Sequence, residues 1–319
     1  MLIERLRRRR ALTDPFRRMP GVRVGIVDVG ANTLRLLVAT RARDGRADAL
    51  REDRRQLGLG EEIVRTGGRI GAKKLDEAAA VARVHVRRAR KLACDRVEIL
   101  VTSPGRQAAN GDELVAALET AAGVRARVLS AEEEGVLAWK GAVSAAGELP
   151  ESVATCDVGG GSTQLVVGSL TGGPAWTRSI DVGSLRLTRR VLESDPPRPS
   201  ELERARGEVA AALAALAPPL PLAALATGGT ARSLRRVVGT ELGERELESA
   251  LRRLSKRSVR EIAADFGVDR PRARTLVAGT TILAGVQRLL GIPLTVGQGG
   301  LREGAALALL EEVAAAATG

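Results

Sequence analysis

The sequence predicts an α/β protein of two similar lobes with a cleft between them. Three observations predict it. The chain has 319 residues, 44% hydrophobic and 28% charged, which is typical of a globular protein and long enough for about two domains. Short β-rich segments alternate with helical ones along the chain. A strand–turn–strand pattern with an aspartate before the turn occurs twice, 129 residues apart.

The first half of the chain begins with a basic segment and a strand–turn–strand. Residues 1–20 contain seven arginines and end in a Met-Pro pair before Gly21, which is typical of a basic arm ahead of a fold. A β-rich run ends in Asp28, a tight turn follows, and a second strand continues. Beyond it we expect a helix at 72–93, a buried strand at 96–103, a helix at 112–122 and a strand at 124–130. Ser130 then begins a further helix.

The second half repeats this construction. The run VATCD ends in Asp157, the sequence GGGS turns, and TQLVVG continues as a strand; aligning Asp157 with Asp28 also matches Gly159 with Gly30. A Pro-rich linker, a helix from Glu201 and a glycine turn between a strand-like run and a helix follow. We therefore expect a basic arm at residues 1–20, an N-terminal lobe at 21–150 and a C-terminal lobe at 151–319. The last helix of the C-terminal lobe can pack back on the N-terminal lobe.

The composition excludes several classes of protein. No run of about 18 apolar residues occurs, and no apolar region follows the N-terminal arginines, so we expect no membrane span, no export and a cytoplasmic location. The single histidine, His85, lies in an Arg-rich helical stretch, and we expect it at the surface. With one histidine and no tyrosine, the chain has few residues that could form a Ser-His-Asp or Cys-His catalytic site. We therefore expect carboxylates to act as the acid or base.

The net charge of +12 is carried mostly by arginine, since the chain has only five lysines. The planar guanidinium suits phosphate oxygens, which favours a polyanionic partner or substrate. The alternative is an arginine bias of coding origin that leaves a solvated surface. Nucleic acid is the less favoured polyanion because stacking platforms are scarce: the aromatic residues are Phe16, Trp139, Trp176 and Phe266.

Three glycine turns favour a phosphate site between the lobes. A glycine turn after a strand lets backbone N–H groups approach phosphate oxygens without interference from a Cβ atom. A single turn of this kind would be an ordinary hairpin, but two in register and a third before a helix favour an anion cradle. The turns are Gly30-Ala31-Asn32-Thr33, Gly159-Gly160-Gly161-Ser162 and Gly228-Gly229-Thr230.

Asp28 and Asp157 each end a strand immediately before such a turn. A carboxylate there could hold a hydrated Mg²⁺ beside substrate phosphates. The alternative for either aspartate is a side-chain bond that only stabilises its turn.

The sequence resembles the exopolyphosphatase/guanosine pentaphosphate phosphohydrolase family, of the actin, Hsp70 and sugar-kinase superfamily. The resemblance runs in family order from residue 22 to residue 304. TSPGRQAAN and SAEEEG are its most specific motifs; the others are VDVGANTLRLLV, LGLGEEIVRTG, CDVGGGSTQLVVG, DVGSLRLT, ATGGTARSL and GLREG.

The resemblance implies hydrolysis of a terminal phosphoanhydride in a cleft between two ribonuclease-H-like lobes, with Mg²⁺ or, alternatively, Mn²⁺. It implies inorganic polyphosphate as the substrate, with guanosine pentaphosphate as the alternative, and a glutamate of SAEEEG as the base that orients the attacking water. Ser130 and Glu133 have the spacing of a capping box, which would occupy Glu133 and leave Glu134 free. We therefore assign the base to Glu134, with Glu133 as the alternative, and substrate contact to Arg106.

The chain departs from the family pattern in the first loop, where Ala31 and Thr33 stand in place of serines, so one hydroxyl donor to phosphate is missing. This leaves open a non-catalytic sensor of polyphosphate or alarmone. A kinase or ATPase of the same superfamily is a further alternative. The chain resembles the short two-domain members of the family, and its oligomeric state, a homodimer included, stays open.

Overall fold

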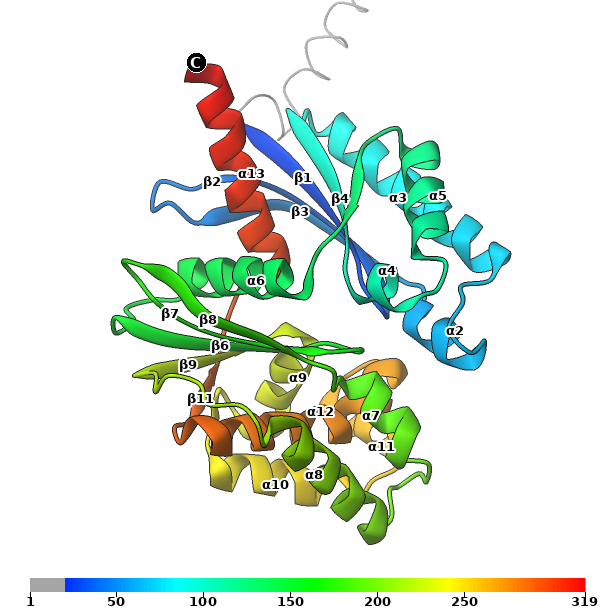
Figure 1. Cartoon of the computed structure of the whole chain (residues 1–319), viewed down its shortest axis with the longest axis vertical. Helices are drawn as coiled ribbons and strands as arrows, with labels where there is room; N and C mark the ends of the chain where they lie inside the picture. The colour runs from blue at the N-terminus through cyan, green and yellow to red at the C-terminus, as the bar shows by residue number, and fades with distance from the viewer. Residues whose placement is uncertain (1–20, 319) are drawn as a thin grey trace, which may run out of the picture.

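The computed structural model describes residues 21–318, so the predicted basic arm lies outside the described residues. It contains two sheets, one above the other in Figure 1, with helices around them. The expected mixed α/β class with two sheets is confirmed. No helix in the described part of the chain is long and apolar enough to cross a membrane.

The first sheet has five strands in the order β3-β2-β1-β4-β5. β1 pairs antiparallel with β2 and parallel with β4. Its strands are β1 (Arg23–Val29), β2 (Thr33–Arg41), β3 (Ala47–Gln56), β4 (Arg96–Val101) and β5 (Ala126–Val128). The helices of this half are α2 (Leu59–Arg65), α3 (Ala72–Lys91), α4 (Ser103–Gln107), α5 (Gly111–Ala122) and α6 (Ala131–Ala145).

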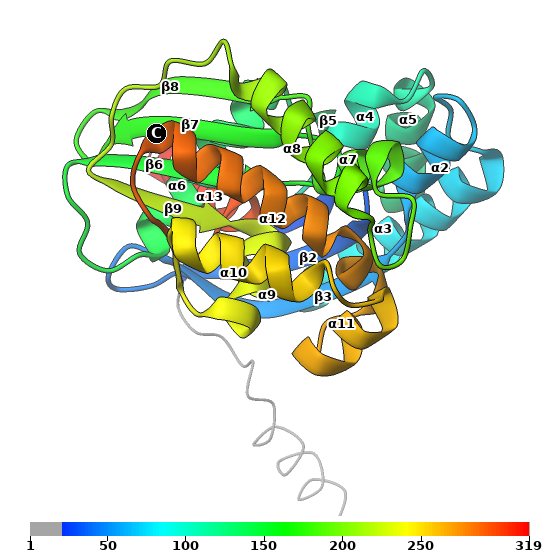
Figure 2. The ribbon, with the colours of Figure 1, turned by 90° about the horizontal axis from the view of Figure 1, so that it is seen from below.

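The second sheet has six strands in the order β10-β11-β9-β6-β7-β8. Its strands are β6 (Ser152–Val158), β7 (Thr163–Ser169), β8 (Gly173–Ile180), β9 (Ala223–Thr227), β10 (Glu241–Leu242) and β11 (Leu294–Val296). The helices are α7 (Ser184–Val191), α8 (Pro199–Leu213), α9 (Gly228–Val238), α10 (Glu244–Leu254), α11 (Val259–Phe266), α12 (Arg270–Leu290) and α13 (Leu301–Thr318). Figure 2 shows α9, α10 and α12 lying across this sheet.

The two hairpins predicted to be equivalent pair in the same way. β6 is antiparallel to β7 and parallel to β9, as β1 is to β2 and β4. Asp28 faces Arg35 across its hairpin, and Asp157 faces Gln164. The internal repeat is therefore confirmed as a repeat of topology.

Strand alternation explains why both faces of the first sheet are covered. On β1, Val27 and Val29 point into a core formed with α3 and α5, while Val24 and Ile26 point into a second core on the opposite face. That second core is completed by α13, through Ala306 and neighbouring residues. The C-terminal helix thus packs on the first sheet.

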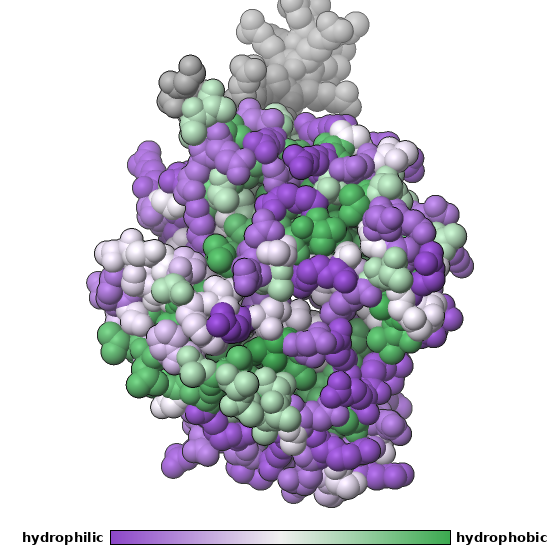
Figure 3. Space-filling view, in the orientation of Figure 1, coloured by the Kyte–Doolittle hydropathy of each residue, from purple (hydrophilic) through white to green (hydrophobic). Residues whose placement is uncertain are grey.

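α6 lies between the two sheets and packs on the second (Figure 1). Ala142 joins Val153 and Leu225 of the second sheet in a small core, and α6 also contacts α13 along its length. In Figure 3, hydrophobic residues gather over the second sheet, while the helices above and below it present mostly hydrophilic residues.

The expected surface position of His85 is wrong. His85 lies on the buried stripe of α3 with Ala78, Ala82 and Ala89, and it is 1% exposed. Neither ring nitrogen has a hydrogen-bond partner among the described residues, and burial lowers the pKa of the ring. Helical periodicity, rather than the arginines beside it in the sequence, decides which face of α3 it occupies.

Candidate active site

The two repeated hairpins bring their aspartates to one cavity between the sheets. The cavity, of about 150 Å³, is lined from both halves of the chain by the ends of β1 and β6, the glycine turns, the start of α6 and the start of α13. Of the predicted site residues, it gathers Asp28, Gly30, Ala31, Asn32, Thr33, Glu134, Asp157, Gly159, Gly160, Gly161, Ser162, Gly228 and Gly229.

Both aspartates are partly buried, and the removal of their carboxylates from water raises their pKa values. The pKa of Asp28 rises to about 6, although Arg302 and Arg35 lower it in part. The pKa of Asp157 is also raised, with Arg232 acting in the opposite direction. Asp28 Oδ1 is buried without a hydrogen-bond partner in the described structure. An unsatisfied buried carboxylate oxygen is costly, so this atom is suited to a ligand.

Gly228 is required by its closeness to Asp157. A Cβ atom at Gly228 would lie 2.2 Å from Asp157 Oδ1, and the residue has φ of +79°, which favours glycine. The third glycine turn therefore leaves room for the carboxylate of Asp157 beside the start of α9.

The donor set at the two aspartates fits Mg²⁺ or Mn²⁺. It offers carboxylate oxygens only, one of them the unsatisfied Asp28 Oδ1. Residues 21–318 contain no group of three or more His, Cys, Asp or Glu that could enclose a metal by themselves. Mg²⁺ commonly takes one or two carboxylates and completes its shell with water and phosphate oxygens, so two aspartates beside a phosphate cradle suffice.

Glu133 and Glu134 point in different directions, as the capping box predicts. Ser130 Oγ accepts the Glu133 backbone N–H at 3.0 Å, and Glu133 Oε2 accepts the Ser130 N–H at 2.8 Å. The other Glu133 oxygen pairs with Arg127 at 3.0 Å. Glu133 therefore does not line the cavity, whereas Glu134 does.

Glu134 is held by Arg106. Arg106 Nη2 donates to Glu134 Oε2 at 2.8 Å, and Nη1 donates to the Leu129 carbonyl at 2.8 Å. Burial raises the pKa of Glu134 to about 7, while Arg106 lowers it in part. Arg106 itself does not line the cavity, and its two hydrogen bonds in this structure are to the Glu134 carboxylate and the Leu129 carbonyl. A carboxylate with a pKa near neutrality is suited to accept a proton from water.

The glycine turns line the cavity, and some of their backbone N–H groups are already used within the turns. In each hairpin the first glycine donates to the last residue of its own turn at 3.0 Å, Gly30 to Thr33 and Gly159 to Ser162. The N-cap of α9, Thr227, makes no side-chain cap, so the first amides of that helix stay available at Gly228 and Gly229. An uncapped helix N-terminus attracts phosphate oxygens. Thr230 is different: it is fully buried, does not line the cavity, and accepts a hydrogen bond at 3.3 Å from Arg272, which does.

Ala31 lies where the two lobes touch. A Cβ atom built at Gly60 would lie 2.9 Å from the Ala31 Cβ, and one at Gly160, in the other lobe, would lie 3.4 Å from it. Gly60 also donates its N–H to the Ala31 carbonyl at 2.7 Å. The first glycine turn is therefore packed between α2 and the second turn.

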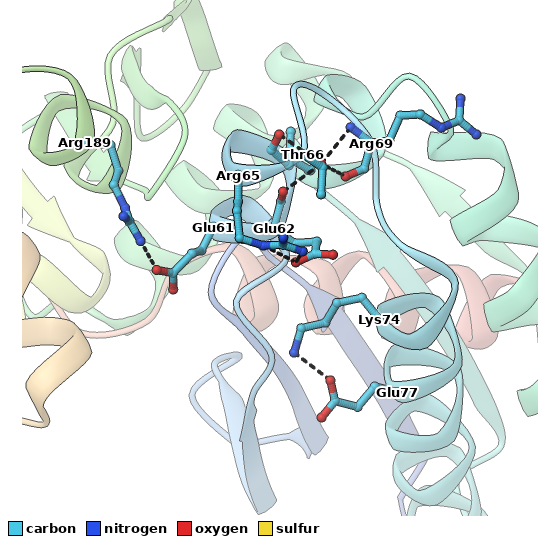
Figure 4. Close-up of polar contacts among 9 residues, drawn as sticks. Glu61, Glu62, Arg65, Thr66, Arg69, Lys74, Glu77 and Arg189 are labelled. Atoms are coloured by element: carbon cyan, nitrogen blue, oxygen red, sulfur yellow. Dashed lines mark hydrogen bonds and ion pairs between the residues drawn. The ribbon is translucent and has the colours of Figure 1, made fainter.

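Two ion pairs connect the lobes beside this contact. Glu61 of α2 pairs with Arg189 of α7, as Figure 4 shows. Arg54 of β3 pairs with Asp269, the N-cap of α12, at 3.1 Å. Both pairs are partly exposed, so each contributes little to the stability of the fold.

Four arginines at the cavity were not among the predicted site residues: Arg35, Arg232, Arg272 and Arg302. They also line a second, larger chamber of about 570 Å³. Arg302 pairs with Glu52 at 2.8 Å and with Glu303 at 3.6 Å. Burial and neighbouring arginines lower the pKa of Arg35 to about 10. α12 offered a signal in the sequence, since its first turn contains arginines and no acid, against the preference of the helix dipole.

A model of the Ppx/GppA phosphatase family matches residues 38–313. Exopolyphosphatase 1 of Mycobacterium leprae is 28% identical over 313 residues, covering 92% of this chain and 91% of that protein. Exopolyphosphatase 2 of Mycobacterium tuberculosis is 34% identical over 195 residues, 58% of this chain and 59% of that protein.

Solved structures match over almost the whole chain. A crystal structure of the Aquifex aeolicus Ppx/GppA family member has a TM-score of 0.79 at 25% identity, covering 93% of this chain and 99% of that one. The crystal structure of an exopolyphosphatase from Cytophaga hutchinsonii shares the fold, with a TM-score of 0.81 at 22% identity over 91% of this chain and 98% of that one.

Proposed function

Because the chain belongs to the Ppx/GppA phosphatase family, we propose that it is an exopolyphosphatase, which hydrolyses the terminal phosphoanhydride of inorganic polyphosphate and releases orthophosphate. The relatives that carry this name support the proposal. Guanosine pentaphosphate, which also ends in linked phosphates, is the alternative substrate.

One observation supports inorganic polyphosphate in particular. The cavity and the adjoining chamber are lined by arginines, carboxylates and glycine turns, with no aromatic side chain among the described lining residues. Repeated guanidinium groups suit repeated phosphates, whereas a base would gain from a stacking surface that neither space offers.

In the proposed reaction, Glu134 orients a water molecule towards the terminal phosphorus and accepts one of its protons. The new oxygen–phosphorus bond forms as the bond from that phosphorus to the bridging oxygen breaks, and the shortened chain leaves with the electron pair. Arg106 fixes the Glu134 carboxylate through its 2.8 Å bond. Phosphoryl transfer depends mainly on such positioning and on neutralising the equatorial oxygens.

The other groups hold the phosphates. The amides at the start of α9 and the remaining amides of the hairpin turns would donate to phosphate oxygens, and Arg232 and Arg272 would add positive charge. Asp28 and Asp157 would hold Mg²⁺ or Mn²⁺, which supplies further positive charge at the phosphates when bound.

The test is orthophosphate release from tripolyphosphate with Mg²⁺ by the wild type, Glu134→Gln and Glu133→Gln. Loss of the base is expected to reduce kcat by about 10²-fold or more, since general-base catalysis contributes about that much. Glu133→Gln removes an adjacent carboxylate that does not line the cavity, so it should keep most of the activity. Wild-type rates in Glu134→Gln would contradict the assignment, and a higher kcat/KM for guanosine pentaphosphate would make that compound the substrate.

A further inference from the structure

Positive charge is unevenly distributed over the helices of this protein. Among the described helices, α2, α5, α6, α8, α10, α11 and α13 carry at least as many acidic as basic residues. The excess of Lys and Arg belongs to α3, α4, α7, α9 and α12. A uniform coding bias towards arginine would not separate the helices in this way.

Three of these basic helices supply arginines to the cleft and its edges. α9 contributes Arg232 and α12 contributes Arg272 to the cavity, while α7 contributes Arg189 to the ion pair with α2. The proposed anion site thus uses Arg232 and Arg272 from these helices. α3 contributes no residue to the cavity.

α3 is the most basic of these helices, with seven Lys or Arg and two Asp or Glu in its 20 residues. Both acids lie in its first turns, and none follows between residue 78 and residue 94. Arg83, Arg87 and Lys91 are exposed and recur every fourth residue, which places them about 6 Å apart along one face. None of the three has an ion-pair partner in the described structure. We call these three residues with Arg88 the α3 basic face.

One residue of the α3 basic face, Arg88, connects it with the chamber beside the active site. Asp53 of β3 lines that chamber, and it pairs with Arg88 of α3 at 3.3 Å. The same aspartate pairs with Arg51 at 2.9 Å, and the exposed Arg55 follows on the strand. β3 therefore carries Arg54 at the chamber and contacts α3 through Asp53, while the acids Glu52 and Asp53 also line the chamber.

We propose that the α3 basic face binds the distal part of a polyphosphate chain too long for the cleft. The inference rests on the proposed function, which places the chain end at Glu134. A flexible chain with a charge on every unit can follow unpaired cations at an exposed surface without a shaped pocket. Single-stranded nucleic acid fits less well, because neither α3 nor β3 contains an aromatic residue for bases to stack on.

The test compares two triple variants that remove the same charge. Arg83→Gln/Arg87→Gln/Lys91→Gln removes the three unpaired cations of the α3 basic face and keeps Arg88, which is paired with Asp53. Arg245→Gln/Arg252→Gln/Lys256→Gln neutralises three cations that are also exposed, on and just after α10 under the second sheet. KM and kcat are measured for tripolyphosphate and for polyphosphate of several hundred units.

The α3 variant is expected to raise KM for the long chain by about tenfold at low ionic strength, as loss of electrostatic attraction predicts. The difference should shrink near 1 M salt, where the screening length is about 3 Å. The α3 variant should have the same KM and kcat for tripolyphosphate as the wild type. The α10 variant should match the wild type on both substrates. An unchanged long-chain KM, or equal effects of the two variants, would overturn the proposal.

The two proposals fail in different ways. If the wild type releases no phosphate from tripolyphosphate, the proposed function fails, while equilibrium binding of end-labelled long polyphosphate to the same variants still tests the α3 basic face. Loss of affinity for single-stranded RNA with unchanged long-chain polyphosphate binding would assign the face to nucleic acid instead and overturn the inference.

Discussion

Glu134 reaches the cavity because its neighbour in the sequence is occupied elsewhere. The capping box uses Glu133 to satisfy the Ser130 N–H, and Arg127 takes its remaining oxygen. The next residue on the helix then projects towards Asp28 and Asp157, where burial and two nearby carboxylates keep its pKa near 7. One local interaction at the start of α6 thus separates the structural glutamate from the proposed base.

The raised pKa of Glu134 predicts the pH dependence of the proposed hydrolysis. The base must be deprotonated, so kcat/KM should fall about tenfold for each pH unit below about 7 and level off above it. Arg106 lowers this pKa, so Arg106→Gln should move the acidic limb to higher pH as well as reduce the rate. The measurement is the pH–rate profile of phosphate release. A limb that stays in place in Arg106→Gln would show that another group titrates.

At the scale of single residues, the sequence predicts the site residues that belong to local motifs. It misses the site residues that tertiary packing brings from distant parts of the chain. Asp28, Asp157 and the glycine turns follow from strand ends and turn chemistry, and the cavity gathers them. Thr230 continues the same motif but turns inward, because the start of α9 buries its side chain against Arg272. Arg272 arrives from a distant helix, so nothing near the glycine turns in the sequence points to it.

At the scale of elements, the contact between α6 and α13 depends on glycine. A Cβ atom at Gly304 would lie 1.8 Å from the Leu137 carbonyl oxygen, and one at Gly141 would lie 2.0 Å from the Gly300 carbonyl oxygen. The backbones of the two helices therefore approach more closely than any side chain allows. This approach sets Glu134, at the start of α6, beside Arg302 and Glu303, at the start of α13.

Gly304→Ala should therefore destabilise the protein. Alanine within a helix normally gains about 1 kcal/mol over glycine, whereas overpacking here should lower the free energy of unfolding by about 1–3 kcal/mol. Gly147→Ala, at an exposed position with no atom near its Cβ, should change it by less than about 0.5 kcal/mol. Urea denaturation of both variants measures the difference. Equal stabilities would show that the helices can separate at no cost.

The sequence predicts the helices and strands of this fold better than it predicts the contacts between them. The helix at Ala72–Lys91, the strands before both aspartates and the capped start of α6 lie where periodicity, turn residues and caps place them. The glycines at residues 300 and 304 were assigned to the family motif GLREG, yet their physical role is to admit another helix. A contact between segments this far apart leaves no periodic trace in either one.

At the scale of the whole molecule, the two halves are interlocked. α6, from the first half, packs on the second sheet, while α13, from the second half, covers the first sheet. The segment between α6 and β6 contains exposed residues, Gly147, Glu148 and Pro150 among them. A break there would cut one covalent link and leave both packed interfaces in place.

A protease site inserted after Gly147 should therefore yield two fragments that stay together. After cleavage, size-exclusion chromatography should give one peak at the elution volume of the intact chain, and the fragments should separate only in denaturant. The uncut protein is the control. Two peaks under native conditions would show that the crossed helices contribute too little to hold the lobes.

The position of α13 also bears on how the protein is made. A ribosome delivers the strands of the first sheet early, but the helix that covers Val24, Ile26 and Leu37 emerges only after the whole second sheet. Until then one apolar face of the nascent first lobe stays open to water and to other chains, a state that invites aggregation or chaperone binding. Because the start of α13 also lines the cavity, the cleft can be complete only after this helix has left the ribosome.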